Sequence, residues 1–321
     1  MPPIVSTILP YVLLIFGFFI LIKGADFFVE GSSSIAKKMR IPDIIVGLTI
    51  VAMGTSSPEL AVSVSAALGG SSDIAIGNVV GSNILNILII LGISAVIVPM
   101  TVDKSMFKRD FPVLLVSAVL LPALCLIFGN HIGRIAALIL LIVFAFYIFL
   151  AVKAALDFRK NGGAETEEGS IKVLPWWKSI LFTIGGAVVI VIGGNISVDN
   201  ATIIAQQLGI SEAIIGLTVV ALGTSLPELV TSLVAAKKGN SDIALGNAVG
   251  SNIFNVLLIL GTTAMIKPFD VTIESLIDQV ILLVISIMLF IMCLTGTKLT
   301  RWEGAAFLAM YVGYAVYIFV R

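Results

Sequence analysis

Two glutamates lie in matched apolar segments of this chain, each at the end of the same polar phrase. Glu59 closes Gly54-Thr-Ser-Ser-Pro-Glu, and Glu228 closes Gly223-Thr-Ser-Leu-Pro-Glu. A carboxylate within the hydrocarbon of a bilayer is costly unless its charge is compensated, so such residues are usually functional. The alternative, a protonated acid in an interhelical hydrogen bond, leaves the matched duplication unexplained. We therefore predict that the pair forms the centre of a cation site.

A break in the helix is expected beside each glutamate. Pro58 and Pro227 have no N–H, and each proline ring crowds the carbonyl four residues earlier, at Gly54 or Gly223. The pattern predicts that the helix breaks here and leaves carbonyls around Ala52 and Gly54 without partners. The alternative for each residue alone is a simple kink, with Ser and Thr bonding back to carbonyls.

The residues between each glycine and proline supply further oxygen atoms. Thr55 lies four positions before Glu59 and so shares its helix face, with Ser56 beside it. Thr224 and Ser225 repeat this arrangement in the second copy. Hydroxyl, carbonyl and carboxylate oxygens are the ligands of hard cations such as Na⁺ and Ca²⁺, and they suit soft transition metals poorly.

A second polar motif follows each glutamate. Gly77-Asn-Val-Val-Gly-Ser-Asn-Ile-Leu-Asn86 returns as Gly246-Asn-Ala-Val-Gly-Ser-Asn-Ile-Phe-Asn255. Two glycines four residues apart predict that another helix backbone approaches closely. Three polar residues then step by four along one face, and we expect this stripe to pack against the Pro-Glu helix and complete a cage. The stripe residues are Asn78, Ser82 and Asn86 in the first copy and Asn247, Ser251 and Asn255 in the second.

The two halves of the chain are copies of each other. An offset of 169 residues takes Glu59 to Glu228 and Asn86 to Asn255, and no gap is needed from residue 29 to residue 99. If each half holds five spans, an odd number, the second copy enters the membrane upside down. Inverted repeats of this kind recur in secondary transporters, with the binding site at the repeat interface near the midplane.

Composition identifies a membrane protein. Of 321 residues, 59% are hydrophobic and 12% charged, about half the charged share of a soluble domain, and the net charge of zero offers no basic field for nucleic acid. Lipid leaves helices as the way to satisfy the backbone of such segments. We predict an all-α integral membrane protein with ten transmembrane helices, at residues 7–30, 42–68, 74–98, 108–128, 132–155, 176–205, 211–236, 243–266, 276–296 and 302–320.

The chain divides into three parts. We assign 1–156 to a first transmembrane repeat, 157–174 to a short cytoplasmic linker and 175–321 to a second, inverted repeat. Lys and Arg cluster in the loops on the linker side, whereas the opposite loops hold only Arg134 and Lys267. The positive-inside rule then predicts that both termini lie outside the cell membrane and the linker in the cytoplasm.

The paired motifs resemble those of the sodium/calcium exchanger family of the cation/calcium antiporter superfamily, in the form of a compact prokaryotic-type member. The resemblance covers essentially the whole chain. It implies ten helices in two inverted five-helix repeats, four cation sites in mid-membrane, and first and sixth helices that slide to expose these sites alternately. It implies a transporter rather than an enzyme, with no cofactor besides the transported Na⁺ and Ca²⁺. We expect it to function as a monomer in the lipid bilayer.

Carried onto this sequence, the resemblance implies two overlapping ligand sets. The calcium ligands are Glu59, Glu228, Thr55 and Thr224, the threonines through their carbonyls. The sodium ligands are Ala52, Ser56, Glu59, Ser82, Asn86, Ala221, Thr224, Ser225, Glu228, Ser251 and Asn255. The helix breaks fall at Gly54, Pro58, Gly223 and Pro227.

One position departs from part of the family. Potassium-dependent exchangers place an Asp where this chain has Asn255, so only two formal negative charges remain at the centre. That resembles the potassium-independent branch and puts in doubt any site that needs a third carboxylate. The function implied is exchange of Na⁺ for Ca²⁺ by alternating access, electrogenic if three Na⁺ move against one Ca²⁺.

Three alternative functions each require a feature that can be looked for in the sequence. A Ca²⁺/H⁺ antiporter of the same fold remains open, because a buried glutamate pair also binds protons and titrates as a coupled unit. A passive cation channel needs a continuous pore, which duplicated broken helices argue against. An intramembrane aspartyl protease needs a Gly-x-Gly-Asp motif in an apolar segment, and the sequence has none.

Overall fold

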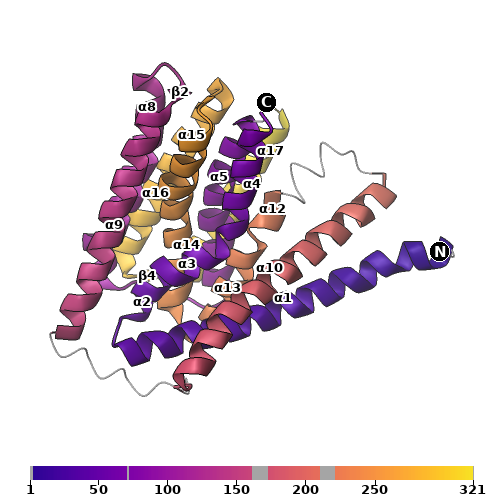
Figure 1. The fold of residues 1–321 in the computed structure, drawn as a ribbon, viewed down its shortest axis with the longest axis horizontal. Helices are drawn as coiled ribbons and strands as arrows, with labels where there is room; N and C mark the ends of the chain where they lie inside the picture. Colours follow the sequence, from indigo (N-terminus) through magenta and orange to yellow (C-terminus); the bar gives the residue numbers. More distant parts are fainter. Residues whose placement is uncertain (1–2, 71, 161–172, 210–220, 321) are drawn as a thin grey trace.

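Apolar helices account for nearly all of the described chain. The computed structural model describes residues 3–70, 72–160, 173–209 and 221–320 (Figure 1). The helices before the linker are α1 (Pro3–Met39), α2 (Asp43–Val46), α3 (Ala52–Thr55), α4 (Ser57–Leu68), α5 (Ser72–Leu85), α6 (Gly92–Ile97), α7 (Lys104–Lys108), α8 (Asp110–Ile127) and α9 (Arg134–Lys160). Those after it are α10 (Trp176–Gln207), α12 (Ala221–Thr224), α13 (Leu226–Lys237), α14 (Ser241–Phe254), α15 (Gly261–Ile266), α16 (Ile273–Gly296) and α17 (Arg301–Val320).

Short elements of other types interrupt these helices. Three π-helical segments occur among the described residues, η1 (Gly47–Val51), η2 (Asn86–Leu91) and η4 (Asn255–Leu260). Two-residue strands pair the halves of the chain at two places, β1 (Met100–Thr101) with β4 (Lys298–Leu299) and β2 (His131–Ile132) with β3 (Phe269–Asp270). Both pairs are antiparallel, with Met100 opposite Leu299 and His131 opposite Asp270. The strand pairs therefore tie loops of one half to loops of the other.

The described helices include most of the expected membrane spans. Seven are long and apolar enough to cross a bilayer, and the helix pair Asp43–Thr55 and Ser57–Leu68, bent by 45°, makes eight if it is counted as one span. The two remaining expected segments are not among these eight. Segment 211–236 begins in residues 210–220, outside the described residues, and segment 302–320 corresponds to α17. A multi-pass helical membrane protein is confirmed, and the count of ten stays a prediction.

The linker prediction is only partly covered by the structure. Helix α9 continues to Lys160, so the first residues of the segment 157–174 are helical. Residues 161–172 lie outside the described part of the chain.

The centre of the bundle is formed by α5 and α14. Every residue of α14 from Ile243 to Phe254 is buried, and α14 contacts α2, η1 and α3 of the other half as well as its own neighbour α13. Helix α5 packs against α4, α16 and η4. Of the six residues of the polar stripe predicted on these helices, five are buried inside the protein and Asn78 is half-buried.

The two longest helices, α1 and α10, lie side by side and run diagonally across the rest of the bundle (Figure 1). Their contact is lined by glycines spaced seven residues apart, a pattern that was not among the sequence predictions. A Cβ added at any of them would meet the partner helix at 2.6–2.8 Å, too close for a side chain. The glycines are Gly17, Gly24 and Gly31 of α1 and Gly186 and Gly193 of α10.

This contact predicts opposite outcomes for two adjacent glycines. In Gly186→Ala the new Cβ would lie 2.6 Å from the backbone N of Phe28, so the helices must separate, and we expect a loss of about 1–3 kcal/mol. Gly185→Ala places its Cβ where no described atom lies within 4 Å, and it gains up to about 1 kcal/mol of helix propensity. Thermal unfolding of the purified protein separates the two; equal melting temperatures would contradict the packing.

Candidate cation cage

Each Pro-Glu motif begins a new helix after a one-residue break. Ser56 separates α3 from α4 with φ −83° and ψ 7°, and Ser225 separates α12 from α13 with φ −89° and ψ 2°. Pro58 and Pro227 each lie in the first turn of the following helix, where their missing N–H costs no hydrogen bond. The structure thus contains the breaks that the sequence predicts, and it centres each of them on the serine.

One detail of the predicted break is wrong. The carbonyl of Ala52 has a partner, because the N–H of Ser56 donates to it at 2.9 Å. Ser56 still completes the helical turn that begins at Ala52, and the helix breaks only after it, so the Ala52 carbonyl keeps its hydrogen bond. Gly54 differs, since the residue four positions later is Pro58, which has no N–H to donate.

The two motif glycines provide space rather than conformational freedom. Neither Gly54 nor Gly223 has a positive φ. A Cβ at Gly54 would lie 2.8 Å from the ring of Phe28 in α1, and Gly223 faces the side chain of Val198 in α10 in the same way. The glycines therefore let the long diagonal helices pass directly over the broken ones.

The two carboxyl groups are buried and close enough to interact electrostatically. Glu59 and Glu228 are each 1% exposed. Ser56 Oγ donates to Glu228 Oε1 at 2.9 Å across the two halves, while Ser225 lies beside the Glu59 carboxyl. The hydroxyl of Ser251 lies beside the carboxyl of Glu228. Hydroxyls from both halves thus gather at the glutamates.

Half of the unpaired buried polar side-chain atoms in the described residues belong to residues predicted for this site. Among the described residues, seven buried side-chain oxygens of the predicted site have no hydrogen-bond partner. They are Glu59 Oε1 and Oε2, Glu228 Oε2, Asn86 Oδ1, Asn255 Oδ1, Ser225 Oγ and Ser251 Oγ. Buried oxygens left unbonded are costly, so a cluster of them indicates a missing positively polarised partner.

A symmetric network of hydrogen bonds holds the Pro-Glu helices against the central helices. Asn78 donates to the carbonyl of Glu59 at 3.2 Å and to Ser63 at 3.0 Å. Asn247 repeats both bonds 169 residues later, to the carbonyl of Glu228 at 3.4 Å and to Ser232 at 2.9 Å.

Threonine hydroxyls connect this network across the halves. Thr55 Oγ1 donates to Asn247 Oδ1 at 3.1 Å, and Thr224 Oγ1 donates to Asn78 Oδ1 at 3.3 Å. Each threonine thereby fixes the asparagine that binds the opposite glutamate's backbone. The two glutamate helices cannot shift independently of the central helices.

Four further asparagines bridge α5 and α14 directly. Asn83 and Asn252 donate to each other's backbone carbonyl at 3.1 and 3.2 Å. Asn86 donates to Asn252 Oδ1, and Asn255 donates to Asn83 Oδ1, both at 2.9 Å. These bonds use the amide nitrogens of Asn86 and Asn255 and leave their Oδ1 atoms unbonded.

The structure brings most of the sequence-predicted residues together, and two of the predicted features fall outside the described residues. Ser82 is buried on α5 as expected, and Thr224 is half-buried. The Ala221 side chain lies outside what the structure describes. The close approach expected at Gly246 and Gly250 is present, since a Cβ on either glycine would lie 2.9 or 2.7 Å from a backbone oxygen of α2 or η1. The positions that would face Gly77 and Gly81, near 213–217, are outside the described residues.

Two features of the site were not predicted from the sequence. Ser63 and Ser232, four residues after each glutamate, bind the asparagines, and the glutamate-plus-four spacing could have identified them. The π-helical segments η2 and η4 begin at Asn86 and Asn255, and π-helical turns are frequent at functional sites. Nothing in the residue pattern predicts these π-helical segments.

The donor set restricts what the cage can hold. In the described parts of the chain no three His, Cys, Asp or Glu side chains gather at one place, so the ligands would be two carboxylates plus neutral oxygens. Such a set fits hard cations and lacks the nitrogen or sulfur that soft metals prefer.

Comparisons with known proteins agree with this chemistry. The family described as "Sodium/calcium exchanger protein" matches residues 9–153 and 178–320. Sodium/calcium exchanger MaX1 of Methanosarcina acetivorans is 35% identical over 96% of this chain and 98% of its own length. Inner membrane protein YrbG of Escherichia coli is 35% identical over 88% and 87%. A structure of the sodium-calcium exchanger NCX_Mj soaked with 100 mM Na⁺ and 10 mM Sr²⁺ matches with a TM-score of 0.84 at 33% identity, over 97% of this chain and 98% of that one.

The asparagine bridge predicts coupled losses of stability. Asn252→Ala removes one donor to Asn83 and the acceptor of Asn86, leaving buried groups unpaired, and we expect a cost of about 1–3 kcal/mol. Asn83→Ala should cost as much, and the double variant less than the sum, because both changes disrupt one network. Asn200→Ala, which removes only a bond within α10, is the control. Additive losses in thermal unfolding would show that the two asparagines act separately.

Proposed function

The chain belongs to the sodium/calcium exchanger family, and from this premise we propose that it exchanges Na⁺ for Ca²⁺ across the cell membrane by alternating access. The observation that carries the proposal is the cluster of seven unbonded buried oxygens contributed by both halves. The calcium ligands are Glu59 and Glu228, with Thr55 and Thr224. The sodium ligands are these glutamates and Thr224, together with Ala52, Ser56, Ser82, Asn86, Ala221, Ser225, Ser251 and Asn255.

The neutral oxygens fit sodium as the counter-ion. Four of the unbonded oxygens belong to hydroxyls and amides that do not take up a proton near neutral pH. A bare Na⁺ needs such oxygens to replace its water, and Ca²⁺, which takes about six to eight oxygens, uses them as well. One set of neutral oxygens can therefore serve both cations in turn.

Competition for the glutamates couples the two fluxes. One Ca²⁺ neutralises both carboxylates, and Na⁺ ions bound through the same carboxylates and the surrounding hydroxyls also neutralise them, with one positive charge in excess when three Na⁺ are bound. The two cargoes therefore cannot occupy the shared ligands together. With three Na⁺ for one Ca²⁺ the cycle is electrogenic, and with Asn255 in place of a third carboxylate it needs no K⁺.

The diagonal helices α1 and α10 are the proposed moving pair. Their glycine-lined contact joins them to each other, and Gly54 and Gly223 make room for the Phe28 and Val198 side chains where these helices cross the broken ones. In this proposal ten spans form two inverted five-helix repeats, with both termini outside and the linker cytoplasmic. Sliding of the pair would expose the cage to one side and then to the other.

Flux measurements test the glutamates. In proteoliposomes loaded with Na⁺ and diluted into Na⁺-free buffer with ⁴⁵Ca²⁺, we expect uptake by the native protein. Glu59→Gln and Glu228→Gln should each fall to the level of protein-free vesicles, because one carboxylate cannot balance Ca²⁺. Glu274→Gln makes the same change at an exposed residue of α16 and should transport normally.

The same assay distinguishes the rivals. Uptake driven by a pH gradient and indifferent to Na⁺ would transfer the function to Ca²⁺/H⁺ exchange, and uptake without any counter-ion would indicate a channel. Addition of K⁺ should leave the rate unchanged; a requirement for K⁺ would contradict the potassium-independent assignment.

One ion pair links the proposed moving pair to the bundle. Lys238, at the end of α13, lies 3.1 Å from Asp26 of α1 and donates to its backbone carbonyl at 3.0 Å; Lys23 is a more distant partner at 3.8 Å. The counterparts 169 residues away are Asn195 and Gly69, so the pair exists on one side of the repeat only. It stabilises the observed arrangement over the alternative one.

Removing this pair should shift the conformational equilibrium. Lys238→Met is expected to raise the population of the alternative arrangement by up to about fivefold, the effect of about 1 kcal/mol for a half-exposed pair. Spin labels at the exposed positions Phe19 of α1 and Ile142 of α9 would report the change as a shift between two distances. Lys237→Met, an exposed neighbour, is the control. Identical distance distributions for the two variants would contradict the role of Lys238.

A further inference from the structure

A groove on the outer side of the bundle has no part in the cation cage. It lies between the start of α8 and the second half of α9, at one edge of the molecule (Figure 1), and encloses about 460 Å³. Eleven residues line it, and none of them belongs to the Pro-Glu or asparagine motifs. The groove lies along two helices that the described protein leaves uncovered on this side.

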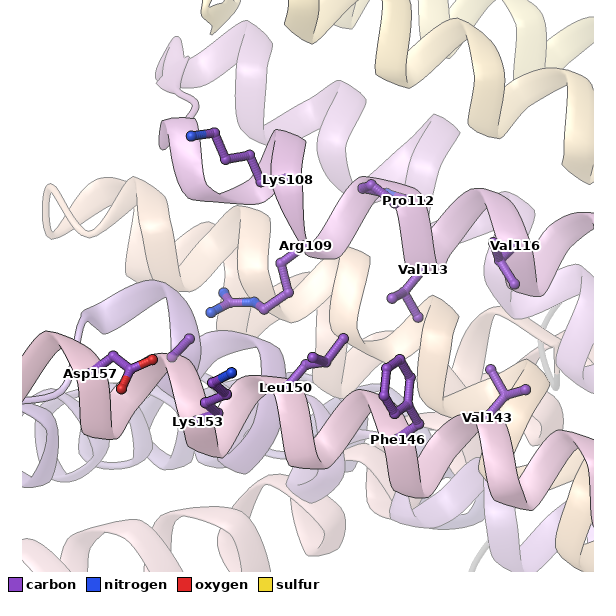
Figure 2. A pocket seen from close by; sticks show the side chains of 11 residues that line it. Lys108, Arg109, Pro112, Val113, Val116, Val143, Phe146, Leu150, Lys153 and Asp157 are labelled. Carbon is purple, nitrogen blue, oxygen red and sulfur yellow. The ribbon is translucent and has the colours of Figure 1, made fainter.

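The groove has a basic end and an apolar end (Figure 2). Lys108, Arg109 and Lys153 lie at one end together with Asp157. Farther along the helices the lining is apolar, formed by Val113, Val116, Val143, Phe146 and Leu150. From Lys153 to Val143 the groove follows ten residues of α9, or about 15 Å of helix.

The Arg109 guanidinium is held in a fixed position by a buried carboxylate. Arg109 Nε donates to Asp110 Oδ1 at 2.7 Å and Nη2 donates to Oδ2 at 2.8 Å. The Asp110 side chain is fully buried and that of Arg109 is 10% exposed. Two of the five N–H groups of the guanidinium are used, which leaves three for a ligand in the groove.

The charges that line this end of the groove do not cancel. The charged residues that line this end are three cations (Lys108, Arg109 and Lys153) and one anion (Asp157). Asp110 and Asp103 also interact with Arg109 but do not line the groove. A ligand in the groove therefore meets three cations and Asp157 alone. An anionic group that accepts several hydrogen bonds is the complement of this end.

We propose that the groove binds one anionic phospholipid from the surrounding bilayer. The phosphate accepts hydrogen bonds from Arg109 and Lys153, Lys108 contributes its positive charge from the rim, and an acyl chain lies along the apolar end against Val143 and Phe146. The depth and polarity of the groove match a molecule with a charged head and a long apolar tail, and basic pockets between transmembrane helices are suited to such headgroups. Val116 and Phe146 are 51% and 58% exposed, so the apolar end opens toward the hydrocarbon from which a lipid would enter.

A soluble anion or a zwitterionic lipid fits the groove less well. A free phosphate would satisfy the basic end and leave the apolar end unfilled. A zwitterionic lipid would bring a further positive charge to a lining that already holds three cations. An anionic headgroup with its tail uses both ends.

Native mass spectrometry of the full-length protein tests the proposal, with phosphatidylglycerol and phosphatidylcholine as probes. The native protein should retain phosphatidylglycerol preferentially. Lys108→Gln combined with Lys153→Gln should weaken its retention about tenfold to thirtyfold, since each lysine near a lipid surface contributes about a factor of five. Lys108→Arg with Lys153→Arg keeps the charges and should keep the preference, which separates lost binding from lost folding.

A matched control removes the same charge outside the groove. Lys104 and Lys160 lie near the same ends of these helices without lining the groove, so Lys104→Gln with Lys160→Gln should retain the lipid normally. Val143→Trp fills the apolar end and should also reduce retention. Equal retention of the two lipids by the native protein, or equal loss in the control, would overturn the proposal. Displacement of the lipid by inorganic phosphate would do so too, because it would identify a site for a free anion.

Discussion

Two buried carboxyl groups without a cationic side chain beside them are the constraint on which the rest of this structure depends. Glu59 and Glu228 are almost fully inaccessible, and in the described residues no Lys, Arg or His forms an ion pair with either. Burying two like charges in one place is strongly unfavourable unless cations or protons bind there. The broken helices, the central asparagines and the crossing helices are arranged so that this site can exist inside a protein whose outer surface is apolar.

The asparagine network makes the site rigid without using its ligands. Amide nitrogens of Asn78, Asn83, Asn86 and their counterparts donate to backbone and side-chain acceptors, while the oxygens of Asn86 and Asn255 stay unbonded. A buried hydrogen-bond network favours one arrangement of the groups it connects. Here the bonds join the central helices α5 and α14 to each other and to the Pro-Glu helices.

The contact of α1 with α10 has the opposite character. Glycines allow the two backbones to touch, and where these helices pass over the breaks the surfaces are again glycine. Over the breaks, the Phe28 ring and the Val198 side chain of the crossing helices occupy the space left by Gly54 and Gly223. The Asp26–Lys238 pair adds a polar link between α1 and the end of α13.

The sequence by itself determined the helical membrane architecture and the duplication, and it predicted a break in each Pro-Glu segment and the residues proposed for the cage. These follow from local chemistry, because proline removes an N–H and a spacing of four places side chains on one face of a helix. Only the tertiary structure decided which groups meet. In the structure Asn83 is hydrogen-bonded to Asn252, and Ser56 donates to Glu228 of the other half. The Ala52 carbonyl accepts from the Ser56 N–H, and Gly54 makes room for the Phe28 ring. Such contacts join residues far apart in the chain, and helix packing sets them rather than any spacing along the sequence.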